Sequence, residues 1–394
     1  MALIIILILL EILTIPVLKG YFFNSSQRLF YLSLGAHFLI SIWLWYVIIA
    51  SLSFRGPFDT PSNIWMHLNM SGMIVAAGIS RFLLCLFHYT GKLIRIRKRG
   101  YIRGLTLAGF IISGSIIFII ASGAFLGKFN FRTEEVIVKI ENLNEALDSL
   151  RIIQISDLHL GGFYKHREKI SRIIEDINSL HPDLIVNTGD FISYGWREFD
   201  GFDTILSKAK SSYGNFAILG NHDMGTYYPD SSPDERIAIA QKVNELAEAS
   251  GYVMLNDENV LLEIKGSEVA LIGVETSGRH PDIIHGNLQK AADGIDSADL
   301  TILLAHDPNQ WKKDVAGKTG IDLTLSGHTH GMQIGIITKR FRWSPSKYFY
   351  PEWHGLFSEG GQHLYVNRGL GVMGVPFRIW MPPEITVITL VSDQ

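Results

Sequence analysis

Long apolar runs fill the first third of the chain. Four of them approach or exceed the roughly 20 residues that an α-helix needs to cross a bilayer. They occupy residues 2–18, 30–53, 63–90 and 105–126. The first run has the length of a signal peptide, but it carries Glu11, lacks a basic start and shows no clear small-residue cleavage site, so we interpret it as a retained helix. The pattern predicts a four-helix transmembrane region over residues 1–127.

After residue 127 the pattern changes to short apolar runs that alternate with helical periodicity. We expect a connector with a first strand at Val136–Ile140 over residues 128–150, and a separate domain over residues 151–394. Within that domain the expected strands are 151–156, 183–187, 217–219, 300–305 and 322–326, the expected helices lie around 166–180, 202–210 and 233–249, and a hairpin pattern covers 252–275. Strands that alternate with helices predict an α/β layered fold.

Charge in the connections predicts how the chain is oriented in a membrane. The connection 91–103 carries six basic residues and no acid, so the positive-inside rule places it in the cytoplasm. Four crossing helices then place the first connection, 19–28, on the same side. The second connection, with Arg55 and Asp59, and both termini fall on the outer side. We therefore expect an integral membrane protein whose large C-terminal domain is extracytoplasmic.

Composition excludes several classes of protein. Of the 394 residues, 47% are hydrophobic, and the formal net charge is −3. Residues 1–127 hold ten basic and two acidic residues, a net charge of +8, so residues 128–394 carry −11. An acidic domain repels phosphate backbones, and we expect no nucleic-acid partner. The single cysteine, Cys85, excludes an intrachain disulfide and a cysteine metal cage.

The residue types that carry chemistry follow the predicted strands. Each fragment alone is a weak signal, since G-D is typical of a turn and A-H-D of a helix start, although two histidines at i and i+2 on an extended segment point the same way. In open α/β sheets, ligands bind beyond the carboxyl ends of the strands, so we expect these side chains to meet at one sheet edge. The set is Asp157, His159, Asp190, Asn221, His222, His306, His328 and His330.

The chemistry of this set points to metal ions. Imidazole and carboxylate without thiolate suit Mn, Fe or Zn. Eight positions are too many for one tetrahedral ion, but they fit two ions that share a bridging ligand, with one residue to spare. Two cations about 3.5–4 Å apart clamp the attacking and leaving oxygens of a displacement at phosphorus. Asp190 is central to the set, and a carboxylate is well suited to bridge two cations.

The ordered fragments D-L-H, G-D, G-N-H-D, H and G-H-T-H resemble those of the calcineurin-like metallophosphoesterases, over roughly residues 135–394. The segments 331–334, 369–371, 376–378 and 382–386 look like a subgroup of bacterial membrane-associated or exported phosphodiesterases. Met332 departs from that subgroup, which often has Gly at this position. The resemblance implies a four-layer α/β/β/α sandwich and a bacterial cell membrane.

The resemblance also implies roles for individual residues. One metal would take Asp157, His159, Asp190 and His330, and the other would take Asp190, Asn221, His306 and His328. His222 and Asp223 would be catalytic: His222 would face the leaving group, and Asp223 would hold its ring. The implied reaction is in-line attack of a metal-bound hydroxide on a monoester, diester or pyrophosphate, with His222 stabilising or protonating the leaving oxygen.

The sequence is less informative about the substrate. The aromatic and basic residues in 339–343 and 347–353 are typical of membrane-surface segments, and the alternative is an exposed loop packed on the core. Residues 164–167 are a phosphate contact or a solvated helix start. Together with the apolar helices, the aromatic and basic residues in 339–353 favour a lipid-linked or membrane-proximal phosphoester as the substrate, with membrane lipids as partners.

Three alternatives remain. The first is a hydrolase of a nucleotide-linked lipid, similar to UDP-2,3-diacylglucosamine diphosphatase, whose chemistry takes place on the cytoplasmic face. The second is a non-catalytic metal-binding scaffold. The third is a transporter or sensor with a phosphoesterase output, which the lack of paired charges in the apolar runs disfavours.

Overall fold

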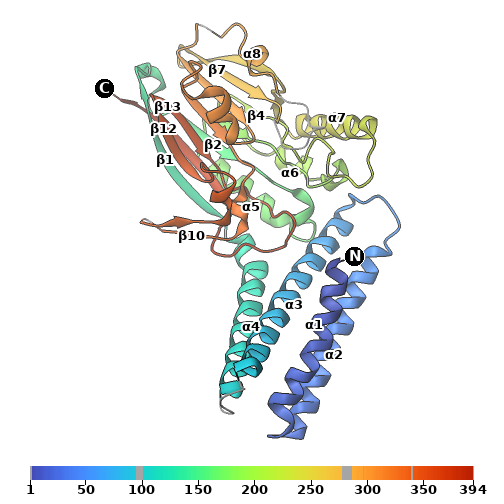
Figure 1. Ribbon diagram of the computed structural model, residues 1–394. Coiled ribbons are helices and arrows are strands. Elements are labelled where there is room, and N and C mark those ends of the chain that lie inside the picture. Colours follow the sequence, from blue (N-terminus) through green and yellow to red (C-terminus); the bar gives the residue numbers. More distant parts are fainter. Residues whose placement is uncertain (1, 95–100, 277–285, 296, 339, 394) are drawn as a thin grey trace. The chain divides into compact units, whose positions relative to one another are not determined.

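The computed structural model describes residues 2–94, 101–276, 286–295, 297–338 and 340–393, and it divides into two compact units (Figure 1). The first unit comprises Met1–Arg55, Met66–Phe125 and Gly374–Phe377. The second comprises Gly56–Trp65, Leu126–Met373 and Arg378–Gln394. The segment Gly56–Trp65, a short connection together with the first five residues of a long helix, therefore belongs to the same unit as the chemistry-bearing residues, and we call this segment the connection Gly56–Trp65.

The first unit is built from four long helices. They are α1 (Ala2–Leu18), α2 (Gln27–Leu52), α3 (Pro61–Ile94) and α4 (Tyr101–Phe125). All four segments are long and apolar enough to cross a membrane. At 1.5 Å per residue, the 34 residues of α3 span about 51 Å, which exceeds a hydrocarbon core of about 30 Å. Most of the basic residues expected to set the orientation lie at 95–100, outside the described residues.

An ion pair joins α1 and α3, and hydrogen bonds link it to α2, which corrects the expectation of no paired charges. Arg81 on α3 lies with its Nη1 3.4 Å from Glu11 Oε1 on α1. Trp45 Nε1 of α2 donates to Glu11 at 2.9 Å, and Arg81 Nη2 donates to Ser41 Oγ at 2.9 Å. A charge in an apolar segment is stable only with such partners. The local sequence does not predict this pair, because its two members are 70 positions apart.

Two six-stranded sheets form the centre of the second unit. The first has the order β1 (Arg132–Glu141), β14 (Glu384–Asp393), β2 (Arg151–Ile155), β3 (Leu184–Asn187), β4 (Asn215–Ala217) and β5 (Val253–Met254). The second has the order β12 (Gly355–Glu359), β13 (Gln362–Val366), β9 (Leu323–Ser326), β8 (Leu300–Ala305), β7 (Ser267–Val274) and β6 (Glu258–Ile264). A separate ribbon pairs β10 (Ile336–Ile337) with β11 (Arg342–Trp343).

Most neighbouring strands run parallel, which brings their carboxyl ends to one side. The pairs from β2 to β5 and from β7 through β8 and β9 to β13 are parallel. The β6–β7 pair is an antiparallel hairpin, and its turn places Lys265 and Gly266 at positive φ, as a tight hairpin turn requires. β14 enters between β1 and β2, parallel to β1 and antiparallel to β2.

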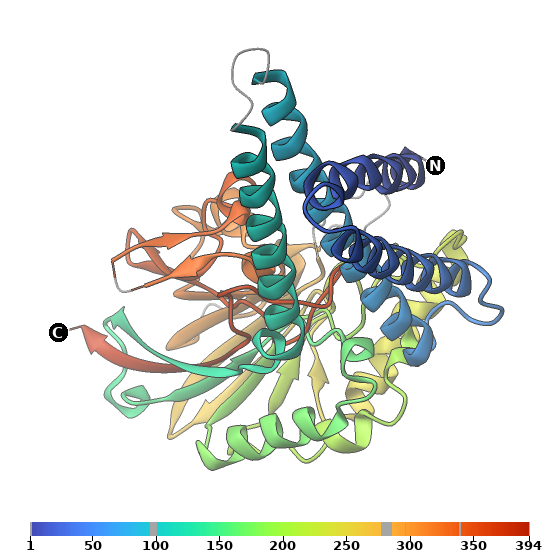
Figure 2. The ribbon, with the colours of Figure 1, turned by 90° about the horizontal axis from the view of Figure 1, so that it is seen from below.

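Helices cover the outer face of each sheet. On the first sheet lie α5 (Arg167–Ser179), α6 (Asp203–Leu206) and α7 (Pro233–Ala249), and Figure 2 shows α5 and α7 beside the strands. α5 forms because its isoleucines at 170, 173, 174 and 177 share one face, and that face is buried. On the second sheet, α8 (Leu288–Ala291) and the short π-helix Trp311–Val315 pack over a further apolar cluster. A third cluster fills the space between the sheets.

This arrangement is the α/β/β/α sandwich that the resemblance implied, and that prediction is confirmed. Several local predictions differ from the structure. The strand expected at 217–219 lies two residues earlier, as β4, and the first strand is longer than the expected Val136–Ile140. The helix expected at 202–210 is the four-residue α6, because Ser207 ends it. In the expected hairpin over 252–275, the first residues instead form β5, which pairs with β4 in the other sheet.

Candidate metal centre

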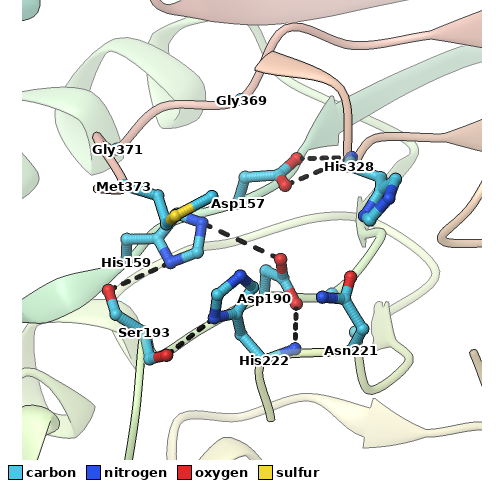
Figure 3. Close-up of polar contacts among 12 residues, drawn as sticks. Asp157, His159, Asp190, Ser193, Asn221, His222, His328, Gly369, Gly371 and Met373 are labelled. Carbon is cyan, nitrogen blue, oxygen red and sulfur yellow. Dashed lines mark hydrogen bonds and ion pairs between the residues drawn. The ribbon is translucent and has the colours of Figure 1, made fainter. Parts of the chain in front are cut away.

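The predicted site residues follow strands of both sheets. Asp157, Asp190 and Asn221 come after β2, β3 and β4 of the first sheet. His306 follows β8, and His328 follows β9, in the second sheet. The structure thus brings the set together where the carboxyl ends of two sheets meet, and the expectation of one sheet edge is wrong. Figure 3 shows side chains from these loops converging around Asp190.

Strained backbone marks five of the seven predicted metal ligands. The φ angles are 51° at Asp157, 43° at His159, 60° at Asp190, 70° at His328 and 48° at His330. Such angles are uncommon for residues other than glycine, and they persist only where the surroundings hold them. Their concentration in one group of loops is typical of a functional site.

Glycines let the backbone approach both carboxylates closely. A Cβ on Gly327 would lie 2.5 Å from Asp157 Oδ2, and one on Gly220 would lie 2.1 Å from Asp190 Oδ1. Any other residue at these two positions would push a carboxylate aside. The G-H-T-H and G-N-H-D motifs therefore place their glycines for packing, and their histidines and asparagine for chemistry.

The first group of candidate ligands comprises Asp157, His159 and His330, all buried. His330 Nε2 lies 3.2 Å from Asp157 Oδ1 and 3.0 Å from His159 Nε2. The other nitrogen of His159, Nδ1, donates to the carbonyl of Ile192 at 3.0 Å. Because a neutral imidazole has one N–H, the lone pair of His159 then lies on Nε2 and points toward His330.

The second group comprises Asp190, His306 and His328, with Asn221 beside them. His306 Nδ1 donates to the Thr188 carbonyl at 2.7 Å, so its Nε2 carries the lone pair. That Nε2 lies 3.2 Å from Asp190 Oδ2, 3.0 Å from Asn221 Oδ1 and 3.2 Å from His328 Nδ1. Asp190 Oδ2 also lies 3.8 Å from His159 Nε2, which places this oxygen between the two groups.

These contacts fit two divalent cations. Nitrogen and oxygen lone pairs that face one another at about 3 Å repel unless a proton or a cation lies between them. Burial raises the pKa of Asp157, but the facing His330 outweighs it and holds that pKa well below its usual range. Burial lowers the pKa of His306, whereas the Asp190 carboxylate raises it to about 10. A proton and a metal ion therefore compete for the same lone pair of His306.

His222 lies beside the candidate ligands rather than among them. Its backbone N–H donates to Asp190 Oδ1 at 2.9 Å, and its ring Nδ1 donates to the carbonyl of Ser193 at 2.6 Å (Figure 3). The ring stacks on Tyr227 with centroids 4.1 Å apart. Since Nδ1 is committed to a carbonyl, Nε2 is the nitrogen that can exchange a proton with a ligand.

The expected role of Asp223 is wrong. Its carboxylate accepts the backbone N–H groups of Asp190 at 2.8 Å, Gly220 at 2.9 Å and Ile192 at 3.1 Å. The ring of His222 is held by the Ser193 carbonyl instead. Asp223 therefore ties the loop after β3 to the loop after β4, and so acts on the geometry of the ligands rather than on the ring.

Several residues that contact this site have no role predicted from the sequence. Tyr350 Oη lies 2.8 Å from His328 Nε2, and Arg378 Nη2 lies 3.2 Å from His330 Nδ1. Arg378 was within a recognised motif, and Tyr350 was within the aromatic-basic stretch. Ser193 and Glu198 lie in a loop without a recognisable motif, and their contacts with the site are visible only in the folded structure. Of the residues considered as a phosphate contact, Lys165 lies over the Trp65 ring and Arg167 pairs with Asp200.

Comparison with known proteins identifies the family. The profile described as calcineurin-like phosphoesterase matches residues 150–332. The uncharacterized metallophosphoesterase YkuE of Bacillus subtilis is 31% identical over 317 residues, which cover 76% of this chain and 99% of that protein. The chain belongs to the calcineurin-like metallophosphoesterases. An uncharacterized metallophosphoesterase of Helicobacter pylori J99 is 28% identical over 274 residues, covering 69% of this chain and 67% of that one.

A relative from a vertebrate is named as a transmembrane protein. The "transmembrane protein with metallophosphoesterase domain" of Danio rerio is 30% identical over 266 residues, covering 65% of this chain. The match spans only 56% of that relative. Family membership makes this chain a metal-dependent phosphoester hydrolase rather than a non-catalytic scaffold. Its four N-terminal helices are long and apolar enough to span a membrane.

Proposed function

We propose that the protein is a membrane-anchored phosphoesterase that uses two divalent cations to hydrolyse a lipid-linked or membrane-proximal phosphoester. The observation that carries this proposal is the pair of adjacent ligand groups, which Asp190 of the second group links by lying 3.8 Å from His159 of the first, with His222 next to them. Mn, Fe or Zn suits the nitrogen and oxygen donors. The first cation would be held by Asp157, His159, Asp190 and His330, and the second by Asp190, Asn221, His306 and His328.

When bound, the cations supply Lewis acidity and an activated water for attack at phosphorus. The chain supplies the geometry and the proton. Asp190 keeps the two ligand groups adjacent, and Asp223 fixes the loop that carries it. The Ser193 carbonyl orients His222 so that Nε2 faces the reacting groups, and it stabilises the protonated ring. His222 can then donate a proton to the leaving oxygen.

The exposed side chains of the aromatic-basic stretch support a lipid substrate. Phe341, Tyr348 and Phe349 are 55%, 71% and 50% exposed, and the basic residues Arg340 and Arg342 are exposed beside them. Exposed aromatics with basic neighbours are typical of membrane-surface segments. The stretch does not behave as one surface, because Trp353 is buried and Tyr350 contacts His328. Lys339 lies outside the described residues.

We expect the triple variant Phe341→Ser, Tyr348→Ser and Phe349→Ser to separate lipid from soluble substrates. Hydrolysis of phosphatidic acid and phosphatidylglycerol in vesicles should fall about tenfold or more, because the variant loses apolar contact with the bilayer. Hydrolysis of soluble bis-p-nitrophenyl phosphate should not change. Leu261→Ser, which removes an exposed apolar side chain on β6, is the control. Equal rates for the triple variant and the wild type on vesicles would contradict the lipid assignment.

We propose further that the catalytic unit is extracytoplasmic. The basic connection 91–103 supports this orientation. The connection Gly56–Trp65 and the chain after α4 share one unit, which agrees with α3 and α4 both crossing the membrane. A paired alkaline phosphatase and green fluorescent protein fusion after Gln394 should give an active phosphatase and no fluorescence. The opposite pattern would overturn the charge argument and favour the nucleotide-linked lipid.

A further inference from the structure

The connection between α2 and α3 packs within the catalytic unit through a buried carboxylate. Asp59 is 0% exposed. Its Oδ2 accepts the backbone N–H of Arg197 at 3.1 Å, and its Oδ1 lies 3.1 Å from Arg197 Nη1. A buried carboxylate is stable only when it is paired and hydrogen-bonded in this way. Asp59 is therefore fixed against the segment Ser193–Glu198, which we call the 193–198 turn.

Close packing around Asp59 shows a built contact. A Cβ on Gly195 would lie 2.5 Å from Asp59 Oδ2, so only glycine leaves room for the carboxylate. The ring of Phe58 meets the ring of Tyr194 edge to face, with centroids 5.0 Å apart. Ile64 is fully buried, and a Cβ on Gly161 would lie 2.7 Å from its Cγ2. The connection thus contacts both the 193–198 turn and the loop that follows His159.

Glu198 links the 193–198 turn to the loop that follows His159 through hydrogen bonds. Its buried carboxylate accepts the backbone N–H groups of Ser193 at 2.9 Å and Tyr194 at 2.7 Å within the turn. The same carboxylate accepts the N–H of Gly161 at 3.1 Å. A shift of the turn would therefore also move the segment two residues after His159.

The 193–198 turn contacts the rings of His222 and His159. The Ser193 carbonyl accepts from His222 Nδ1 at 2.6 Å, and Ser193 Oγ lies 3.1 Å from His159 Nδ1 (Figure 3). The contacts are continuous from Asp59 through Arg197 and the turn to Ser193, and from there to both rings. Partners of this kind set the tautomer and orientation of an imidazole.

We infer that the connection Gly56–Trp65 is part of the support of the active site, and that Asp59 is a positioning residue for His222 and His159. The inference rests on the proposed function. It makes membrane insertion and catalysis interdependent, because a segment between two membrane-spanning helices holds the catalytic geometry. A soluble fragment that starts after α4 lacks this support.

The test uses the full chain in detergent with Mn²⁺ and diphenyl phosphate, whose phenyl leaving group needs a proton. Asp59→Ala should lower kcat about 10- to 100-fold, the usual range for outer partners of a metal site, with KM and the content of two metals nearly unchanged. Asp59→Asn should recover most of the activity, because its amide oxygen still accepts the Arg197 N–H. Arg197→Ala should lower kcat as well, and the double variant should be no worse than Asp59→Ala, since both act through one contact.

A matched control is the surface pair of Arg167 and Asp200, of which Asp200 lies two residues after the turn. Asp200→Asn should leave kcat unchanged. A wild-type kcat in Asp59→Ala, or an equal loss in Asp200→Asn, would overturn the inference. Loss of both metals in Asp59→Ala would also overturn it, because the residue would then maintain the fold rather than orient His222.

Amide hydrogen exchange separates this inference from the proposed function. The Ser193 and Tyr194 amides donate to Glu198, so their exchange should accelerate in Asp59→Ala and not in Asp200→Asn. Unchanged exchange would overturn the positioning role. An inactive wild type with faster exchange in Asp59→Ala would contradict the proposed function and leave the support by the connection intact.

Discussion

Asp190→Ala should abolish hydrolysis and lower the metal content of the protein. The carboxylate lies between the two ligand groups, 3.2 Å from His306 and 3.8 Å from His159, and its other oxygen accepts from the backbone of His222. Removing it affects both cation positions and the loop of the catalytic histidine. Because metal ions supply several kcal/mol of transition-state stabilisation, kcat should fall at least about a thousandfold. The measurement is kcat on bis-p-nitrophenyl phosphate together with elemental analysis.

The control for Asp190→Ala is Asp176→Ala on the exposed side of α5, which should keep both activity and metal. Normal metal occupancy with full turnover in Asp190→Ala would contradict the bridging role. A loss of turnover with both metals retained would leave Asp190 outside the ligand set.

His222→Ala should have the opposite signature, with both cations retained and most of the turnover lost. Its ring is oriented by Ser193 and lies beside the ligands, so its removal should not release metal. A positioned general acid contributes about 10²–10⁴-fold, and that loss is expected for an alkyl or phenyl leaving group. The loss should be smaller for p-nitrophenolate, which leaves without a proton. Steady-state rates across a series of leaving groups measure this difference.

His181→Asn provides the control for His222→Ala. His181 is exposed and has a φ of 48°, a conformation that asparagine tolerates. Its activity should match that of the wild type. Loss of metal in His222→Ala would show that His222 is a ligand, and an equal loss for all leaving groups would remove its role as an acid.

The positions of the candidate ligands were predictable from the sequence because each follows an apolar run. Asp157, Asp190 and His306 lie within three residues of the end of a buried strand, and their backbone position is set by local sequence. Which sheet each strand joins depends on distant pairing. β14, from the end of the chain, lies between β1 and β2, and no local pattern indicates that insertion. Distant pairing also divides the strands that precede the site between two sheets. The prediction of a single sheet edge was therefore wrong, although the side chains do come together.

Side-chain partners were harder to predict than positions. Asp223 is adjacent to His222 in sequence, yet it points to three backbone N–H groups, because the loop turns it away from the ring. Ser193 and Glu198 contact the site only because the fold brings the turn to it. Asp59 is the extreme case: it lies in a short connection between apolar helices, and its partner Arg197 is 138 positions away.

The most direct test of the account is the metal dependence of diester hydrolysis. The full chain, purified in detergent without chelator so that it keeps Gly56–Trp65, is assayed on bis-p-nitrophenyl phosphate beside p-nitrophenyl phosphate. We expect cleavage of the diester that is lost with EDTA, restored by Mn²⁺ and absent in Asp190→Ala. Cleavage that persists after all metal has been removed, or no cleavage of either ester with two metals bound, would contradict it.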